Sequence, residues 1–321
     1  MNLNTSPTEQ SFTRGQMQAY RIELVKLIEG LIPHDGRLEP LDGVGLYRAS
    51  SALELNYGVS TPAFCVIAQG SKKVVLGDED YRYDPMQYLI ATAELPIVSQ
   101  IMEASKDSPY LALSVRLDSG TVNSVLASIG QIGVRGQTNV RALGVNALDG
   151  NLLDAVVRLI RALYTPRDAP YLADLIKREI IYRLCRGEQK DRLCHIACRS
   201  GDAHQIAQAI EILRSKYNQP LQVADIAQDI GMSVSGFYSH FREVTAMSPL
   251  QFQKRLRLQT ARRLMLIENL DASSTGYKVG YNDASHFNRD YKGLFGLPPR
   301  QDILKLRQSR TEEDDETIAH G

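Results

Sequence analysis

Hydrophobic positions follow three successive patterns along the chain, and each pattern predicts a different kind of structure. Residues 11–31 carry apolar side chains at the spacing of an amphipathic helix, which Pro33 terminates. From about 41 to 118 the chain changes to short runs rich in β-branched and aromatic residues, which favour a small barrel or sandwich. Helical spacing returns at 152–164 and at 171–186.

The predicted strands are seven short runs with turn residues between them. They read VGLYRA, AFCVIAQ, KKVVL, YRYD, QYLIAT, PIVSQIME and YLALSVRL. The runs KKVVL and YRYD flank Gly77–Asp80, which predicts a hairpin with a turn at those four residues.

The remainder of the chain is helical in pattern, and its helices are short. A polar stretch from about 187 to 203 precedes it, so we place a domain boundary near residue 200. A helix over 221–230 ends at Gly231, which suits the left-handed position after a helix, and Ser233 is placed to cap the next helix. Two helices joined by such a short glycine turn form a helix-turn-helix.

The same element occurs a second time about fifty residues later. The turn glycines Gly231 and Gly280 stand 49 positions apart, whereas the aromatic and proline positions that follow stand 50 apart, which implies one extra residue in the second turn. These later pairs are Phe237 and Phe287, Phe241 and Tyr291, and Pro249 and Pro299. Between the copies, apolar residues at helical spacing predict a rigid connecting helix.

The second helix of each copy has one apolar face and one polar face. Phe237 and Phe241, with Val234 and Val244 extending the stripe, would anchor the first such helix to its partner. The polar faces then present Ser235, Tyr238, Ser239 and Arg242 in the first copy and Ser285, Asn288, Arg289 and Lys292 in the second. We expect these side chains to contact double-stranded DNA, because two helices about 34 Å apart reach successive major-groove faces of one duplex.

The residue types suggest separate roles on the DNA. Arg289 suits a two-bond contact to guanine and Asn288 one to adenine, each worth about 1–3 kcal/mol of discrimination. Arg242 and Lys292, near the far ends of their helices, are placed for phosphates, and the serines and Tyr238 for bases directly or through water. A single amphipathic helix with an arginine is usually an ordinary surface helix, but the tandem copies favour DNA binding.

Charge is segregated along a chain whose total is zero. The 37 Lys and Arg residues balance 37 Asp and Glu residues. Residues 204–310 nevertheless hold 15 basic against 9 acidic side chains, and residues 311–321 hold five acids and no base. A basic module is the electrostatic footprint of a DNA-binding unit, and we expect the acidic tail to be disordered.

Composition indicates a cytoplasmic protein, associated with the nucleoid when it is bound to DNA. The chain has 43% hydrophobic residues but no uninterrupted apolar run of about 18 residues, so no membrane partner is expected. Its amino terminus lacks the pattern of a signal peptide. Four cysteines are too few for a disulfide scaffold and fit a reducing compartment.

The C-terminal residues resemble a known family. Residues from about 206 to 304 are similar to the DNA-binding domain of the AraC/XylS transcription regulators, through DIAQDIGMSVSGFYSHFREVTAMSPLQFQKRLRLQTARRLM and VGYNDASHFNRDYKGLFGLPPRQDI. In that family both recognition helices enter the major groove of one site. Two positions depart from the family pattern, because Ala246 stands where glycine is usual and Thr275-Gly276 replaces an apolar pair.

The first half resembles one subgroup of the same regulators, through FCVIAQGSKKVVLGDEDYRYDPMQYLIATAELPIVSQIMEASKDSPYLALSVRLD. The resemblance implies an α+β fold, with a cupin-like sensory barrel and flanking helices over residues 1–200. Residues 201–310 would then form an all-α domain of two helix-turn-helix motifs joined by a long helix, ahead of the tail at 311–321. The subgroup includes activators of alcohol and aldehyde metabolism genes, so a small carbonyl compound is a candidate signal.

A cupin-type enzyme with a DNA-binding appendage is the main alternative. A metal-dependent cupin needs several histidines and a carboxylate on facing strands, and none of the six histidines falls between residues 41 and 118. Cys194, His195 and Cys198 lack the paired spacing of a zinc site. We therefore expect no metal, no cofactor and no catalytic residue.

Cys65 is the one reactive residue type in the predicted barrel. It alternates with Ala63 and Ile67 on one face of a strand, which is typical of a small buried hydrophobic residue. The alternative is an effector-binding thiol that senses electrophiles or oxidants, and this role requires a lowered pKa.

Together these patterns predict a sequence-specific DNA-binding transcription regulator, an activator, that responds to a small-molecule effector. The expected partners are DNA, RNA polymerase and a second copy of the chain, paired through helices near 152–186. A further alternative is a ligand-independent DNA-binding protein whose barrel serves only for assembly.

Overall fold

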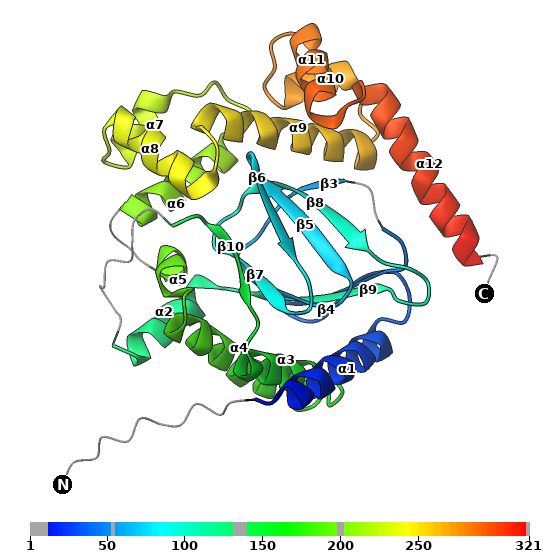
Figure 1. Cartoon of the computed structure of the whole chain (residues 1–321). Coiled ribbons are helices and arrows are strands. Elements are labelled where there is room, and N and C mark those ends of the chain that lie inside the picture. The colour runs from blue at the N-terminus through cyan, green and yellow to red at the C-terminus, as the bar shows by residue number, and fades with distance from the viewer. Residues whose placement is uncertain (1–11, 53–54, 131–139, 198–201, 319–321) are drawn as a thin grey trace. The chain divides into compact units, whose positions relative to one another are not determined.

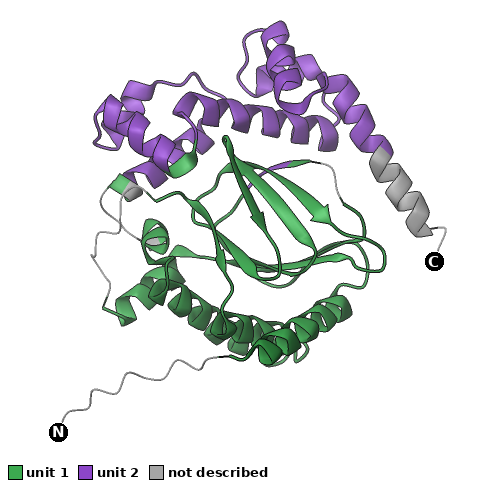
Figure 2. Ribbon diagram, viewed as in Figure 1, with its two compact units in different colours: residues 1–56, 60–204, 244–246 green, residues 57–59, 205–243, 247–321 purple. Residues whose placement is uncertain are grey.

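The computed structural model describes residues 12–52, 55–130, 140–197 and 202–318, and the chain forms two compact units (Figure 2). The N-terminal unit comprises Met1–Asn56, Ser60–His204 and Val244–Ala246, and the C-terminal unit comprises Tyr57–Val59, Gln205–Glu243 and Met247–Gly321. The expected α+β fold, with antiparallel sheets followed by two helix-turn-helix motifs, is confirmed. Cys198, weighed above as a metal ligand, lies outside the described residues.

Two antiparallel sheets form the centre of the N-terminal part of the chain (Figure 1). The strands are β1 (Gly36–Leu41), β2 (Val44–Ala49), β3 (Asn56–Val59), β4 (Ala63–Gln69), β5 (Ser71–Leu76), β6 (Glu79–Tyr83), β7 (Gln87–Ala91), β8 (Pro96–Glu103), β9 (Tyr110–Arg116) and β10 (Leu143–Ala147). The larger sheet has the order β1-β2-β9-β4-β7-β10, and the smaller has the order β3-β8-β5-β6. The seven predicted runs coincide with β2 and β4 to β9, whereas β1, β3 and β10 were not predicted.

The larger sheet has a buried side chain on each of its two faces along β4. Phe64 and Val66 point from one face into a core that helices α1 (Arg14–Leu31), α3 (Gly150–Ala162) and α4 (Ala169–Arg186) complete. Cys65 and Ile67 alternate with them and so point from the opposite face. Short helices α2 (Ser119–Ser128) and α5 (Lys190–Ala197) also contribute to the core, the latter within the stretch expected to be only polar.

The hairpin between β5 and β6 has a shorter turn than the sequence indicated. Strand pairing continues to Leu76 opposite Glu79, so the turn consists of Gly77 and Asp78 and not of four residues. Gly77 has a φ of 61°, the left-handed conformation that two-residue hairpin loops favour. The prediction of a hairpin is confirmed, and only its turn length was wrong.

Seven helices make up the C-terminal part of the described chain. They are α6 (Asp202–Ser215), α7 (Val223–Asp229), α8 (Val234–Thr245), α9 (Pro249–Ile267), α10 (Ala272–Lys278), α11 (Ala284–Phe295) and α12 (Pro299–Ile318). The pairs α7–α8 and α10–α11 are the two motifs, and the ends of their helices confirm the extra residue in the second turn. Helix α12 continues to Ile318, so helical backbone occupies much of the segment that was expected to be a disordered tail.

Both turn glycines have the left-handed conformation that the sequence indicated. Gly231 has a φ of 71° and Gly280 a φ of 92°. A Cβ atom on Gly280 would lie 2.1 Å from the carbonyl oxygen of Asn218, so a side chain is excluded there by contact as well as by conformation. None of the helices in the described part of the chain combines the length and the hydrophobicity that crossing a membrane requires.

Ala246, one of the two departures from the family pattern, occupies a position that favours glycine. Its φ is 58°, and in the described residues only Asn269 is another non-glycine residue with a positive φ. A left-handed alanine is less stable than a right-handed one by about 1–2 kcal/mol. The family's usual glycine would remove this strain.

We expect Ala246→Gly to raise the free energy of unfolding by about 0.5–1 kcal/mol, since the relieved strain exceeds the extra entropy of glycine in the unfolded chain. Urea unfolding followed by circular dichroism measures the change. The control is Ala261→Gly in the middle of α9, which should lower stability by about 1 kcal/mol or more. A loss of stability in Ala246→Gly would contradict the strain.

Candidate DNA-binding surface

Helix α8 is held by two aromatic side chains on one face. Phe237 and Phe241 are both fully buried, and the ring of Phe241 lies 5.3 Å from that of Phe252 on α9. The hydroxyl of Ser233 accepts a hydrogen bond from the backbone N–H of Gly236, so the predicted cap is present. Val234 was expected to extend the apolar stripe, but it is 44% exposed: helical spacing places it on the side of Phe241, and it is the first residue of α8, at the end of that stripe.

The opposite face of α8 carries the side chains predicted to meet DNA. Ser235, Ser239 and Arg242 are exposed, and Tyr238 is half-buried. The hydroxyl of Ser239 lies 3.4 Å from a carboxylate oxygen of Glu243 and donates to it. This serine therefore has an internal acceptor, which competes with any base contact.

Helix α11 repeats this arrangement in the second motif. The carboxylate of Asp283 accepts the backbone N–H of His286 at 2.7 Å and caps the helix, while Phe287 and Tyr291 are fully buried. Gly276 on α10 allows the close approach, because a Cβ there would lie 3.0 Å from the Phe287 ring. This contact gives a physical reason for the departure at Thr275-Gly276.

All four predicted side chains on α11, namely Ser285, Asn288, Arg289 and Lys292, are exposed. Within the described part of the chain, neither Arg289 nor Lys292 forms a side-chain hydrogen bond or an ion pair. Two cations without an internal partner on one helix face are available for the phosphates and base edges of a nucleic acid. Of the two motifs, the second thus offers the stronger electrostatic surface.

A buried charge network fixes α11 to α9 and α12. Arg262 on α9 donates two hydrogen bonds of 2.7 Å to the carboxylate of Asp302 on α12, and the hydroxyl of Tyr291 donates a third at 2.7 Å. Burial and then the bond to Asp302 raise the pKa of the Tyr291 hydroxyl, so it stays a donor. Sequence reasoning missed this network, because its partners lie far apart in the chain.

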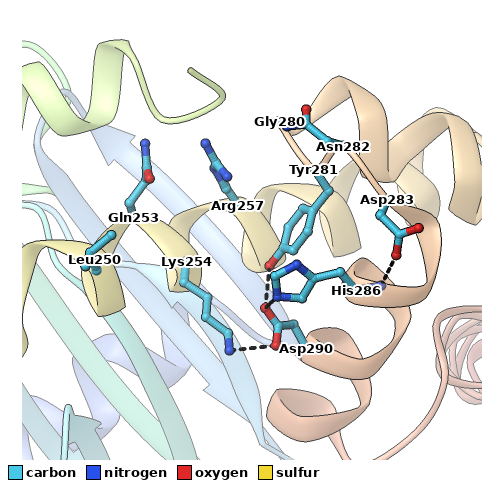
Figure 3. Close-up of a pocket in the computed structure, with 10 residues that line it drawn as sticks. All are labelled: Leu250, Gln253, Lys254, Arg257, Gly280, Tyr281, Asn282, Asp283, His286 and Asp290. Atoms are coloured by element: carbon cyan, nitrogen blue, oxygen red, sulfur yellow. Dashed lines mark hydrogen bonds and ion pairs between the residues drawn. The ribbon is translucent and has the colours of Figure 1, made fainter. Parts of the chain in front are cut away.

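A pocket of about 430 Å³ lies between α9 and the second motif (Figure 3). One of its lining residues is Asp290, whose carboxylate pairs with Lys254 at 2.8 Å and accepts a hydrogen bond from the hydroxyl of Tyr281 at 3.2 Å. The ring of His286 lies 3.5 Å from the same carboxylate. The aspartate thus ties α11 to α9 on this side and neutralises one of the lysines of the basic module.

Some of the basic side chains counted in the sequence have structural partners. Arg257 on α9 donates to the carbonyl oxygens of Tyr217 and Gln219, each at 2.7 Å, and so holds the loop before α7. Arg262 belongs to the buried network. The excess of basic residues over 204–310 therefore overstates the charge available to DNA.

The surroundings of Cys65 oppose the lowered pKa that a sensing thiol requires. Burial raises the pKa of its thiol to about 11, although the neighbouring Lys72 ammonium acts in the opposite direction. The thiolate is the nucleophilic form, and at neutral pH it is a minor species here. Cys65 is nevertheless half-buried, so part of its surface is accessible.

Comparison with protein families gives two matches to the chain. A model described as the AraC-type transcriptional regulator N-terminus matches residues 40–192, and a helix-turn-helix domain model matches residues 226–303. Among individual proteins, the chain is 27% identical over 155 residues to the HTH-type transcriptional regulator ArgR of Pseudomonas aeruginosa, covering 48% of this chain and 47% of that protein. It is 20% identical over 158 residues to the HTH-type transcriptional activator RhaS of Yersinia pestis, covering 48% and 56%.

The chain spans about half the length of the curated relatives it matches. Among solved structures, that of fatty-acid-bound ToxT from Vibrio cholerae is similar, with a TM-score of 0.50, 13% identity, and coverage of 81% of this chain and 94% of ToxT. At this identity the likeness concerns the fold alone.

The charge network of the second motif should contribute to the free energy of unfolding. Asp302→Asn should lower the free energy of unfolding by about 3–5 kcal/mol, because it leaves the guanidinium of Arg262 without a counter-charge in a buried site. Chemical denaturation of the full chain measures the loss.

The matched control is Glu268→Gln, which removes a surface ion pair with Lys278 in the same unit. Exposed pairs contribute roughly 0–1 kcal/mol, so this variant should unfold almost as the parent chain does. Equal losses for both variants would contradict a special role of the network.

Proposed function

Because the chain belongs to the AraC-type transcriptional regulators, we propose that it binds operator DNA through both helix-turn-helix motifs and regulates transcription in response to a small molecule. The relatives it matches are regulators, and this agrees with the expectation of a regulator over an enzyme. The observation that carries the proposal is the pair of exposed polar faces, on α8 and α11, which stand at matching positions in the two motifs.

The motifs are suited to act together, because α9 is packed against both. Phe252 near its start contacts α8, and Arg262 near its end reaches Tyr291 through Asp302. Arg289 and Asn288 are proposed to read bases, and Lys292 and Arg242 to hold phosphates. Ser235, Tyr238, Ser239 and Ser285 complete the surface.

The N-terminal unit is proposed to hold the effector and to dimerise. The activator named among the relatives supports an activating role through RNA polymerase. ToxT, which shares the fold, binds a fatty acid in its solved structure, and this supports a small-molecule site in the unit. The alcohol- or aldehyde-related class implied by the resemblance remains a prediction.

Helix α4 supplies the proposed dimer surface. Helix α3 is almost wholly buried in its own core, so of the segment near 152–186 only α4 offers an apolar face. Tyr171, Leu175 and Tyr182 lie along one side of α4 and are 71%, 48% and 43% exposed. A second copy of the chain would cover this stripe.

Selection of bound sites from random DNA by the full chain tests the DNA-binding proposal. A regulator that uses both motifs should recover two conserved segments about one helical turn apart. Recovery of a single short segment, or of no common sequence, would contradict the proposal.

Two variants of α11 separate specificity from affinity. Arg289→Ala should relax preference at one base position and cost about 1–3 kcal/mol on the selected site. Lys292→Ala should weaken all sequences alike and reduce the slope of log K against log salt concentration by about one. Lys106→Ala, an exposed lysine of the N-terminal unit, is the control and should change neither. Equal effects of the α11 variants on every sequence contradict the division of roles.

The dimer proposal predicts that Leu175→Glu converts the protein to monomers, because a charge in an apolar contact raises the dimer dissociation constant by about tenfold or more. Analytical ultracentrifugation measures the mass. Ile22→Glu, a comparably exposed apolar position on α1, is the control and should remain dimeric. A dimeric Leu175→Glu protein would place the interface elsewhere.

A further inference from the structure

Lys72 points into the space between the two sheets of the N-terminal unit. On β5 it stands opposite Tyr83 of β6, and its strand places it on the same face as the buried Val74 and Leu76. The next residue, Lys73, points the other way and pairs with Asp80 at 2.5 Å. Only one of the two adjacent lysines is therefore an outward surface residue.

Side chains from the larger sheet meet Lys72 across this space. Cys65 of β4 interacts electrostatically with the Lys72 ammonium. Tyr110 of β9 interacts with Cys65 and forms a hydrogen bond with the hydroxyl of Tyr83. An amine, a thiol and two phenols, contributed by four strands, thus surround one position.

These groups are desolvated by protein but keep accessible surface. Desolvation lowers the pKa of the Lys72 ammonium, and burial raises that of the Cys65 thiol to about 11. Both side chains nevertheless remain half-buried. Groups that are surrounded by protein and still keep accessible surface can be reached by a small ligand.

The ammonium of Lys72 lacks an internal counter-charge. It forms no hydrogen bond or ion pair within the described part of the chain, and no Asp or Glu there acts on its pKa. Glu79, on the same strand as Tyr83, is already bonded to Tyr81 and Arg141. A desolvated charge without a partner is unfavourable, so an anion that reaches it gains a strong interaction.

The geometry points to Lys72 as the anion-binding group of the effector site, and to a small monocarboxylate with an apolar body as the effector. The ammonium would pair with the carboxylate, and Tyr110, whose hydroxyl accepts from Tyr83, keeps its own proton as a further hydrogen-bond donor. The side chains that share these two sheet faces with Lys72 and Cys65 are apolar and buried (Val74, Leu76 and Ile67), so the surroundings of the ammonium favour a ligand with an apolar body. The inference rests on the proposed function only for the consequence of binding, and it names a carboxylate in place of the alcohol- or aldehyde-related class that the resemblance implied.

The site should bind carboxylates less tightly as the pH rises. The groups that face Lys72 are Cys65 on β4, Tyr83 on β6 and Tyr110 on β9, and each is neutral near pH 7. Lys72 is the group whose charge changes first, because its pKa is below the usual 10.5. Affinity is therefore fully present while the amine is protonated and is lost as the pH passes through its lowered pKa.

Calorimetric titration of the full chain with hexanoate, octanoate and benzoate tests the proposal, with hexanamide and hexanol as neutral analogues. We expect at least one carboxylate to bind and the neutral compounds to bind at least tenfold more weakly. Lys72→Met should weaken carboxylate binding by about tenfold to a hundredfold, the worth of a hydrogen bond to a charged group. Lys73→Met, the outward neighbour, is the matched control and should bind as the parent chain does.

Thermal unfolding without ligand shows whether Lys72→Met is folded. Removing an unpaired buried charge should leave its Tm equal to or above that of the parent chain. The proposal is overturned if no carboxylate of the series binds, if the neutral analogues bind equally well, or if Lys72→Met binds unchanged. A lower Tm in the unliganded variant also contradicts it, since Lys72 would then have an internal partner.

Operator binding by the same preparations separates this proposal from the previous one. If carboxylate binding depends on Lys72 but the protein does not bind DNA, only the proposed function as a regulator is contradicted. If the protein selects DNA sites but binds no carboxylate, only the proposed class of ligand is contradicted.

Discussion

The attachment of α8 and α11, the two helices proposed to read DNA, to one continuous helix is the constraint on which the C-terminal unit depends. Helix α9 has 19 residues and is therefore about 28 Å long, close to one turn of B-DNA. Aromatic packing of Phe241 on Phe252 fixes α8 near its start, and hydrogen bonds through Asp302 fix α11 near its end. Packing is tolerant of small shifts, whereas a bidentate charged contact is directional. The second motif is thus oriented more strictly than the first.

The sequence predicted those features that depend on neighbouring residues. Strand alternation, helical spacing, the turn glycines and the one-residue difference between the motifs are all local patterns, and the structure confirms them. The eight polar positions, of which all but Tyr238 are exposed, followed from the buried aromatic pairs, because the opposite face of a helix is fixed once one face is known. Their contacts with DNA remain a prediction. Partners such as Arg262 and Asp302, 40 positions apart, leave no local pattern, so the network was not predicted.

The two faces of the larger sheet differ in their surroundings, and only one of them faces the proposed ligand site. Phe64 and Val66 lie in the large apolar core with α1, α3 and α4, while Cys65 between them faces the polar space around Lys72. The sequence drew attention to Cys65 because cysteine is chemically conspicuous. It gave no reason to prefer Lys72, since two adjacent lysines on a strand look alike until the register shows which one points inward.

The anchoring of α12 decides where the chain can be truncated at its C-terminal side without loss of the fold. Asp302 supplies the counter-charge of Arg262, and Arg307, one and a half turns further along, donates to the carbonyl of Met265 at the end of α9. Truncation directly after α11 would remove both groups and leave the guanidinium of Arg262 buried without a counter-charge. Recombinant fragments and natural nonsense alleles that stop before this point should therefore yield insoluble or rapidly degraded chains.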